Sequence, residues 1–280
     1  MKPATAIARA QLRATFEVRP LRWWQLWRLL SPRRWWRMWR LKRVQLGPEV
    51  DWTVGDDGYV RPPITPPVCL DDQGRVIDFG RRWGMDGPPV EAYSVVHHPE
   101  RFAPLVEVAQ AMVEHLARTY DVTVEDITDL DGEREPKWRP DPAETDERPV
   151  TRRAVAITPQ RGDAARLIVV WSSFPGVELW AGAFFREAFP DCGCDACDEE
   201  WSVCADQLEQ TALAVALGSF SEKIKGRRLE TRLRRPGSSS GGTSRLKDQS
   251  YSAARIARAR RLLAARPTDW QPWPRRPAAV

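Results

Sequence analysis

The chain has 280 residues, of which 42% are hydrophobic, which is enough to bury a core in one large domain or two small ones. Its five cysteines are odd in number, no signal peptide is readable, and no uncharged run approaches the roughly 18 residues of a membrane-spanning helix. These features exclude a secreted disulfide scaffold and a transmembrane protein, and we expect a cytoplasmic protein with reduced thiols.

The formal net charge of +5 conceals a strong segregation of charge along the chain. Residues 1–46 hold 12 basic residues and one acidic residue, residues 47–222 hold 15 and 34, and residues 223–280 hold 16 and three. Arginine outnumbers lysine by 37 to 6 and asparagine is absent, which is typical of GC-rich codon usage, so arginine content alone is weak support for nucleic-acid binding. Two interpretations stay open: the basic ends neutralise the acidic body, or they contact an anionic partner.

A segment rich in tryptophan and arginine begins the chain. Six tryptophans lie between residues 21 and 46 among arginines, and Pro32 divides this stretch into two short amphipathic segments. Indole rings and guanidinium groups suit a lipid headgroup boundary, so one hypothesis is a peripheral helix on an anionic membrane. The alternatives are a solvated or disordered leader, and contact of residues 1–46 with nucleic acid.

An α+β domain is predicted for residues 47–236. Its first regular element is a helix from Phe102 to Tyr120, because apolar residues recur there at the i, i+3, i+4 spacing of a buried helical face. Residues 47–66, which are rich in Gly, Pro and Asp, and the acidic residues 129–148 are expected to be loops.

Three strand-like runs follow and predict an antiparallel meander. They are residues 152–158, 166–172 and 177–184. The Ser-Phe-Pro-Gly sequence of residues 173–176 joins the last two runs, and its Pro-Gly pair is typical of a type II turn. Trp171 and Trp180 flank this turn, and we interpret them as packing residues rather than ligand-stacking ones.

A second long helix is predicted from Asp198 to Ile224, with Asp198 as its N-cap. Residues 228–234 alternate apolar and charged side chains, which suits an edge strand. Residues 237–251 are expected to be a Gly/Ser-rich loop, and residues 252–280 a short helix followed by a Pro/Trp-rich end. Together the elements predict an α+β fold, in which a small antiparallel sheet (a three-strand meander plus an edge strand) has helices packed on one face.

The strongest functional signal is a cluster of three cysteines within six residues, Cys192, Cys194 and Cys197. The C-x-C-x₂-C spacing lets three thiolates converge on one metal ion, because Gly193 permits a tight backbone turn. We predict a structural zinc site, which needs a fourth ligand. The sequence does not select among the candidates for it, which are Asp195, Asp198, Cys69, Cys204, His97 and His98.

Two other interpretations of the cluster stay open. The first is a redox or catalytic dithiol, since Cys194 and Cys197 form a C-x-x-C at the predicted start of a helix. The lack of a β-α-β context and of a cis-proline signal argues against it. The second is that the cysteines pack as small hydrophobic residues, which is the role we expect for Cys204 on the apolar stripe of its helix.

Other catalytic chemistry has little support. His115 falls off the apolar stripe of its helix and is expected to be solvated, whereas His98 and Pro99 are typical of the start of a helix. No nucleophile lies near His97 and His98 in the sequence, and no Gly-rich phosphate loop is present. We therefore assign no catalytic residue.

Three strings of residues resemble an actinobacterial-type family of unknown function that carries the motif FPxCGCDACDE. They are residues 98–105 (HPERFAPL), 174–177 (FPGV) and 189–199 (FPDCGCDACDE). The likeness runs from residue 54 to Arg276 and leaves out residues 1–46. It implies no activity, so it supplies neither catalytic residues nor a metal assignment.

The sequence thus favours a non-catalytic interaction or structural module with zinc as its candidate cofactor. A thiol- or metal-dependent enzyme that uses the same cysteines is one alternative, and binding of an anionic membrane or nucleic acid through the basic ends is another. A site closed by four protein ligands would indicate a structural zinc, and an open coordination position a catalytic one.

Overall fold

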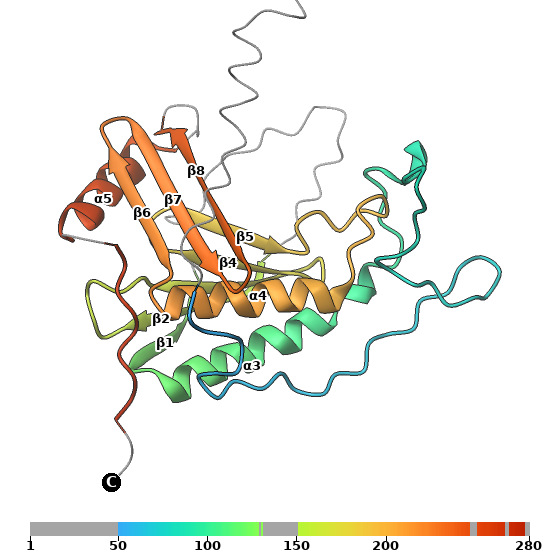
Figure 1. Cartoon of the computed structure of the whole chain (residues 1–280), viewed down its shortest axis with the longest axis horizontal. Helices are drawn as coiled ribbons and strands as arrows, with labels where there is room; N and C mark the ends of the chain where they lie inside the picture. The colour runs from blue at the N-terminus through green and yellow to red at the C-terminus, as the bar shows by residue number, and fades with distance from the viewer. Residues whose placement is uncertain (1–49, 129, 131–150, 247–250, 267–268, 278–280) are drawn as a thin grey trace, which may run out of the picture. The chain divides into compact units, whose positions relative to one another are not determined.

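The computed structural model describes residues 50–128, 130, 151–246, 251–266 and 269–277 (Figure 1). The Trp/Arg-rich segment and most of the acidic segment 129–148 lie outside the described residues. The described part contains three α-helices and two antiparallel sheets, and this confirms the predicted α+β class. No helix in it is long and apolar enough to cross a membrane.

The larger sheet is a five-stranded meander in the order β1-β2-β3-β4-β5. Its strands are β1 (Val122–Asp126), β2 (Thr151–Pro159), β3 (Leu167–Ser172), β4 (Val177–Ala181) and β5 (Phe185–Phe189). The three predicted runs correspond to β2, β3 and β4, but the last run ends at Ala181 rather than at Phe184. Gly182 follows with a φ of 58°, a left-handed conformation that turns the chain into β5.

The main core lies between this sheet and two helices that run side by side, α3 (Pro104–Thr119) and α4 (Trp201–Ala216) (Figure 1). Successive side chains of a strand point to opposite faces, so Val155, Ile157 and Val169 enter this core, whereas Ala156 and Ile168 join a smaller cluster on the other face. The helix predicted from Phe102 to Tyr120 is confirmed as α3, preceded by the 3₁₀ turn η2 (Pro99–Phe102).

The second helix is shorter than predicted. It begins at Trp201 and ends at Ala216, well before Ile224. Gly218 explains the end: its φ is 71°, its N–H bonds to the carbonyl of Val215, and the next N–H bonds to Ala214, a typical left-handed termination. Phe220 then begins a strand, so the apolar stripe that we assigned to one helix belongs to two elements.

The second sheet has the order β6-β7-β8 and corrects two predictions. Its strands are β6 (Phe220–Lys225), β7 (Arg228–Arg235) and β8 (Ser238–Arg245). The predicted edge strand is β7, which lies in the centre, and the predicted Gly/Ser loop contains β8. Backbone pairing does not need large side chains, and at Gly241 a Cβ would lie 2.6 Å from the Thr231 carbonyl oxygen, so glycine there permits the close pairing.

The C-terminal part packs back onto the body. The predicted helix is confirmed as α5 (Ala253–Ala264), and the hydroxyl of its N-cap Ser252 accepts a hydrogen bond from the Arg255 N–H. Trp270 and Trp273 belong to the main core, and the Trp273 indole donates to the Ala165 carbonyl at 2.8 Å.

The β3–β4 turn differs from the predicted type II turn, because Gly176 is not in the left-handed region. Gly176 is needed for space instead, since a Cβ there would lie 3.0 Å from the Phe189 carbonyl oxygen. Trp171 and Trp180 are both buried, which confirms their packing role.

His115 is buried rather than solvated, so the prediction for this residue was wrong. Its Nε2 lies 2.8 Å from Oδ2 of Asp57, and the Tyr120 hydroxyl donates to the same oxygen at 3.2 Å. Burial alone would raise the pKa of Asp57, but these contacts with His115 and Tyr120, together with a backbone contact, outweigh it and lower the pKa. Asp57, which lies in the irregular segment before α3, thus covers the face of α3 that carries His115, and this face was predicted to be exposed to solvent.

Candidate metal centre

The loop between β5 and α4 carries the three cysteines and is folded around one carboxylate. Glu199 accepts hydrogen bonds from the backbone N–H groups of Asp191, Cys192 and Gly193 at 3.0, 3.1 and 2.7 Å. The peptide bond between Phe189 and Pro190, directly before the loop, is cis, contrary to the sequence expectation. Gly193 has a φ of 78°, and this agrees with the tight turn that we predicted there.

The three thiols converge. The sulfur atoms of Cys192, Cys194 and Cys197 all lie within 4.8 Å of one another, and those of Cys194 and Cys197 are 3.5 Å apart. Zinc–thiolate bonds of about 2.3 Å in a tetrahedron place sulfurs about 3.8 Å apart, so these separations suit one ion. Cys194 is buried and the other two are exposed. The predicted proximity of the sulfurs is confirmed.

The shared environment separates the pKa values of the thiols. Burial would raise the pKa of Cys194, but hydrogen bonds with the Cys192 thiol and with the backbone of Cys197 and Ser94 lower it to about 7. Burial and the neighbouring thiols raise the pKa of Cys197 to about 12, and burial also raises the pKa of Cys192. The lowered pKa of Cys194 favours the thiolate, which is the form that binds metal.

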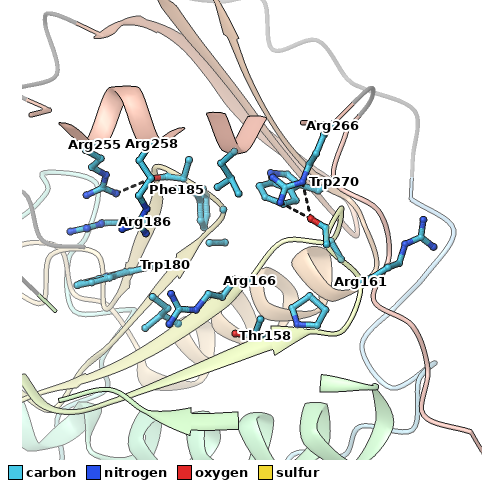
Figure 2. Close-up of a pocket in the computed structure, with 18 residues that line it drawn as sticks. Thr158, Arg161, Arg166, Trp180, Phe185, Arg186, Arg255, Arg258, Arg266 and Trp270 are labelled. Carbon is cyan, nitrogen blue, oxygen red and sulfur yellow. Dashed lines mark hydrogen bonds between the residues drawn. The ribbon is translucent and has the colours of Figure 1, made fainter. Parts of the chain in front are cut away.

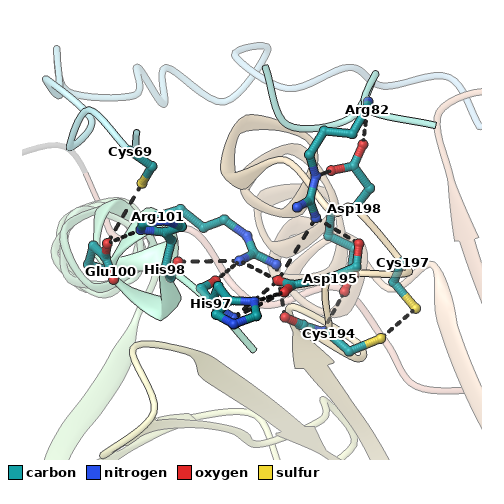
Figure 3. A network of polar contacts seen from close by, with 12 residues as sticks. Cys69, Arg82, His97, His98, Glu100, Arg101, Cys194, Asp195, Cys197 and Asp198 are labelled. Atoms are coloured by element: carbon teal, nitrogen blue, oxygen red, sulfur yellow. Dashed lines mark hydrogen bonds and ion pairs between the residues drawn. The ribbon is translucent and has the colours of Figure 1, made fainter. Parts of the chain in front are cut away.

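Asp195 is the centre of a polar network that fixes the loop (Figure 3). Its carboxylate is buried and contacts the His97 ring at 2.5 Å, Arg101 at 3.6 Å and Arg82 at 3.9 Å. The backbone of the loop is held as well, because Arg101 donates to the Gly193 carbonyl at 2.9 Å and Trp83 to the Asp195 carbonyl at 3.1 Å. The loop is therefore bound to residues 82–101 by both its side chains and its backbone.

Asp198 does not cap a helix, in contrast to our prediction. It has a φ of 51°, and its carboxylate accepts hydrogen bonds from the backbone N–H of Arg82 at 2.9 Å and from the Arg82 side chain. Glu200 is the N-cap of α4 and makes no side-chain cap bond. Asp198 and Glu199 therefore hold the loop and its neighbour Arg82, whereas Glu200 accepts a hydrogen bond from the Ser202 hydroxyl at 2.6 Å.

None of the six candidates for the fourth ligand joins the three sulfurs among the described residues. Asp195 and His97 contact each other, and Asp198 pairs with Arg82. Cys204 is in the main core, as predicted. Cys69 and His98 form a separate group with Glu100, on the far side of the network from Cys194 and Cys197 in Figure 3.

This second group was missed because Glu100 looks like an ordinary surface residue of a helical turn. Its carboxylate lies 2.9 Å from Nδ1 of His98 and 3.9 Å from the sulfur of Cys69. The ligand atoms of the three residues lie within 4.8 Å of one another. His98 has the predicted place directly before a helical turn, although its side chain makes no capping bond.

The chain belongs to a family of unknown function, because the model of the Family of unknown function (DUF6226) matches residues 65–277. Comparison with curated proteins and with solved structures finds no match. The matched range includes the cysteine loop, the Asp195 network and α5, and it leaves out residues 1–46, as the resemblance in the sequence does.

Proposed function

We propose that the cysteine loop is a structural zinc site, in which Cys192, Cys194 and Cys197 bind one ion as thiolates, and that the protein is a non-catalytic interaction or structural module. The observation that carries this proposal is the convergence of three sulfurs within 4.8 Å. Three thiolates, of which those of Cys194 and Cys197 have sulfurs 3.5 Å apart, favour zinc or another soft ion over calcium or magnesium.

Zinc also suits the position of the loop in the fold. The loop anchors residues 82–98, which contain the 3₁₀ turn η1 (Val90–Ala92) and are otherwise irregular, and it also binds Arg101 in η2. An ion bound by three residues of one loop would fix its backbone, and therefore its contacts with Arg82 and Arg101. Binding to the folded loop and not to the unfolded chain would add to stability by mass action.

Element analysis of the purified full chain tests the proposal. We expect about one zinc per chain, and loss of the zinc in Cys194→Ser. Cys69→Ser is the matched control, since it removes a buried thiol from the separate group and should retain the metal. Metal-free wild-type protein after mild purification, or equal metal in the Cys194→Ser variant and the wild type, would refute the proposal.

A thiol-dependent enzyme is a second candidate, supported by the 3.5 Å separation of Cys194 and Cys197. Cys192→Ser separates the two functions. A zinc site loses one of its three ligands in this variant, so its affinity falls, whereas a dithiol of Cys194 and Cys197 still forms a disulfide under mild oxidants. A mass decrease of two hydrogen atoms in oxidised Cys192→Ser, with the two electrons passing to the added oxidant, would favour the dithiol if the wild type holds no metal.

The remaining parts of the proposal concern the cell. Five free cysteines support a cytoplasmic location, where thiols stay reduced. For residues 1–46, contact with an anionic membrane or nucleic acid stays a proposal whose test is vesicle flotation and salt-dependent binding. We also propose that the string of residues 189–199 characterises the family.

A further inference from the structure

A second group of metal-binding side chains lies outside the cysteine loop. It consists of Cys69, His98 and Glu100, whose ligand atoms all lie within 4.8 Å of one another. Oε1 of Glu100 is at its centre, because it lies 2.9 Å from Nδ1 of His98 and 3.9 Å from the sulfur of Cys69. Cys69 and Glu100 are 31 positions apart in the chain, so the fold and not a local motif brings the group together.

Cys69 lies at the base of a short hairpin that fixes its backbone. The Cys69 carbonyl accepts a hydrogen bond from the Ile77 N–H at 2.9 Å, and the Asp71 N–H donates to the Arg75 carbonyl at 2.8 Å. The Asp71 carboxylate closes the turn, since it accepts the N–H of Arg75 at 2.9 Å. Cys69 itself is only 5% exposed, and its thiol points toward Glu100 (Figure 3). The sulfur is therefore already in place for a ligand bond.

His98 is held in an uncommon backbone conformation directly before η2. Its φ of 55° and ψ of 52° lie in the left-handed region, which histidine enters more often than most residues with a side chain. The His98 carbonyl accepts hydrogen bonds from the backbone N–H and from the side chain of Arg101, at 3.2 and 3.3 Å. These contacts fix the backbone from which the imidazole reaches Glu100.

The separations in this group suit a zinc ion. In a tetrahedron, zinc bonds of ordinary length place a nitrogen and an oxygen ligand about 3.3 Å apart, and a sulfur and an oxygen ligand about 3.6 Å apart. The observed 2.9 and 3.9 Å differ from these values by only about 0.3–0.4 Å. A thiolate and an imidazole also favour zinc over calcium or magnesium, which take oxygen ligands.

The same side chains are poorly arranged for an activated cysteine nucleophile. Such a site needs a histidine in contact with the thiol and a carboxylate behind the histidine. Here the carboxylate of Glu100 stands between the two, and among the described residues His98 makes no hydrogen bond with Cys69. The geometry therefore favours three ligands of one ion over a catalytic pair.

We propose that Cys69, His98 and Glu100 form a second zinc site, which leaves the fourth coordination position to water. The His98 side chain is 30% exposed and that of Glu100 52%, so the ion can enter from solvent. The Cys69 thiol gives up its proton to solvent on binding, and one thiolate and one carboxylate then balance the divalent charge. The bound ion fastens the hairpin of Cys69 to η2, which leads into α3.

This site should bind zinc more weakly than the cysteine loop. It supplies one thiolate where the loop supplies three, and its carboxylate is half exposed. We therefore expect it to lose its ion during purification and to fill when zinc is added. The zinc that remains in the purified chain is then that of the cysteine loop.

Zinc that is added to the protein has few other places to bind. The described residues contain two groups of three converging candidate ligands, and these groups share no residue. The cavity between the large sheet and α5 has no cysteine, histidine or carboxylate among its described lining residues, so it offers zinc no ligand of these kinds (Figure 2). A change in bound zinc can therefore be assigned to one group by the cysteine that is replaced.

Dialysis of the full chain against zinc, followed by element analysis, tests this inference. We expect the wild type to bind about one zinc per chain more than Cys69→Ser at the same free zinc concentration. Cys194→Ser should still take up the zinc of the second site. The difference between the wild type and Cys69→Ser is the same whether or not the cysteine loop holds metal, so this test can succeed where the proposed structural zinc fails.

Replacing the exposed ligand keeps the test valid if loss of the buried Cys69 thiol impairs folding. Glu100→Gln should weaken zinc binding at the second site by about tenfold or more in chelator competition, because an amide lacks the charge of the carboxylate. Glu107→Gln removes the same charge from an exposed position of α3 outside the group, and should change the affinity by less than about twofold.

Cobalt(II) gives a spectroscopic measurement of the same site. When it is added to Cys194→Ser, we expect the charge-transfer absorption of a cobalt–thiolate bond, and we expect this absorption to disappear when Cys69→Ser is combined with Cys194→Ser. The inference is overturned if the wild type and folded Cys69→Ser bind equal zinc, or if Glu107→Gln weakens binding as much as Glu100→Gln. It is also overturned if the cobalt absorption persists in the double variant.

Discussion

Replacing Asp195 by asparagine removes the charge at the centre of the network but keeps the shape of the side chain. The Asp195 carboxylate is 6% exposed and the Arg101 side chain 3%, so water screens their contact very little. Arg101 also donates to the carbonyls of His97 and Gly193, which fix its position in the variant. The guanidinium would therefore stay buried without its nearest opposite charge.

The cost of this change follows from the geometry. Two unit charges 3.6 Å apart attract each other by about 4–5 kcal/mol at an effective dielectric constant of about 20. Asp198 keeps part of this attraction for Arg101, and the asparagine oxygen still accepts the His97 N–H. We therefore expect Asp195→Asn to lower the free energy of unfolding by about 3 kcal/mol, which is typical of a broken buried pair.

Urea unfolding at neutral pH, followed by circular dichroism, measures this loss. Asp126→Asn is the matched control, because Asp126 is 67% exposed and pairs with Arg153, and we expect its loss to be below about 0.5 kcal/mol. Arg101→Gln should cost less in the Asp195→Asn background than in the wild type. If the losses of Asp195→Asn and Arg101→Gln simply add in the double variant, or if Asp195→Asn costs less than about 1 kcal/mol, Asp195 does not stabilise the buried charge of Arg101.

Three further variants test other contacts. Asp57→Asn should lower the free energy of unfolding at neutral pH by about 1–2 kcal/mol. The pKa of Asp57 in the folded protein is below its ordinary value of 3.8, so the wild type should lose this advantage in acid unfolding as the pH falls below that value. Glu199→Gln should weaken zinc binding by about tenfold in chelator competition, since an amide cannot accept all three N–H groups of the loop; unchanged affinity would contradict this role. Gly182→Ala should lower the free energy of unfolding by more than about 2 kcal/mol in thermal unfolding, because its Cβ would meet the Glu222 carboxylate. Gly226→Ala, at nearly the same φ but in open space, should lower it by only about 1 kcal/mol. Equal losses would show that only the positive φ matters and not the contact with Glu222.

The regular elements that the sequence predicted well are those with a strong local pattern of apolar residues. The helix before Tyr120 has one buried stripe that faces the main core. The runs that became β2 and β3 are apolar segments whose side chains are buried on both faces of the sheet. The second sheet was largely missed, because β8 consists of Ser, Gly and Thr up to its last residue. Its stability comes from pairing with β7 along its whole length, and no local pattern records a backbone pairing.

The site was predicted in part for the same reason. Three cysteines in six residues must lie close together in any fold, and the structure confirms that their sulfurs converge. The partners of Asp195 and Asp198, by contrast, lie in residues 82–101, and a carboxylate next to a cysteine gives no sign in the sequence of which guanidinium it meets. His115 shows the same limit, since the residue that covers it, Asp57, belongs to a segment that reads as loop.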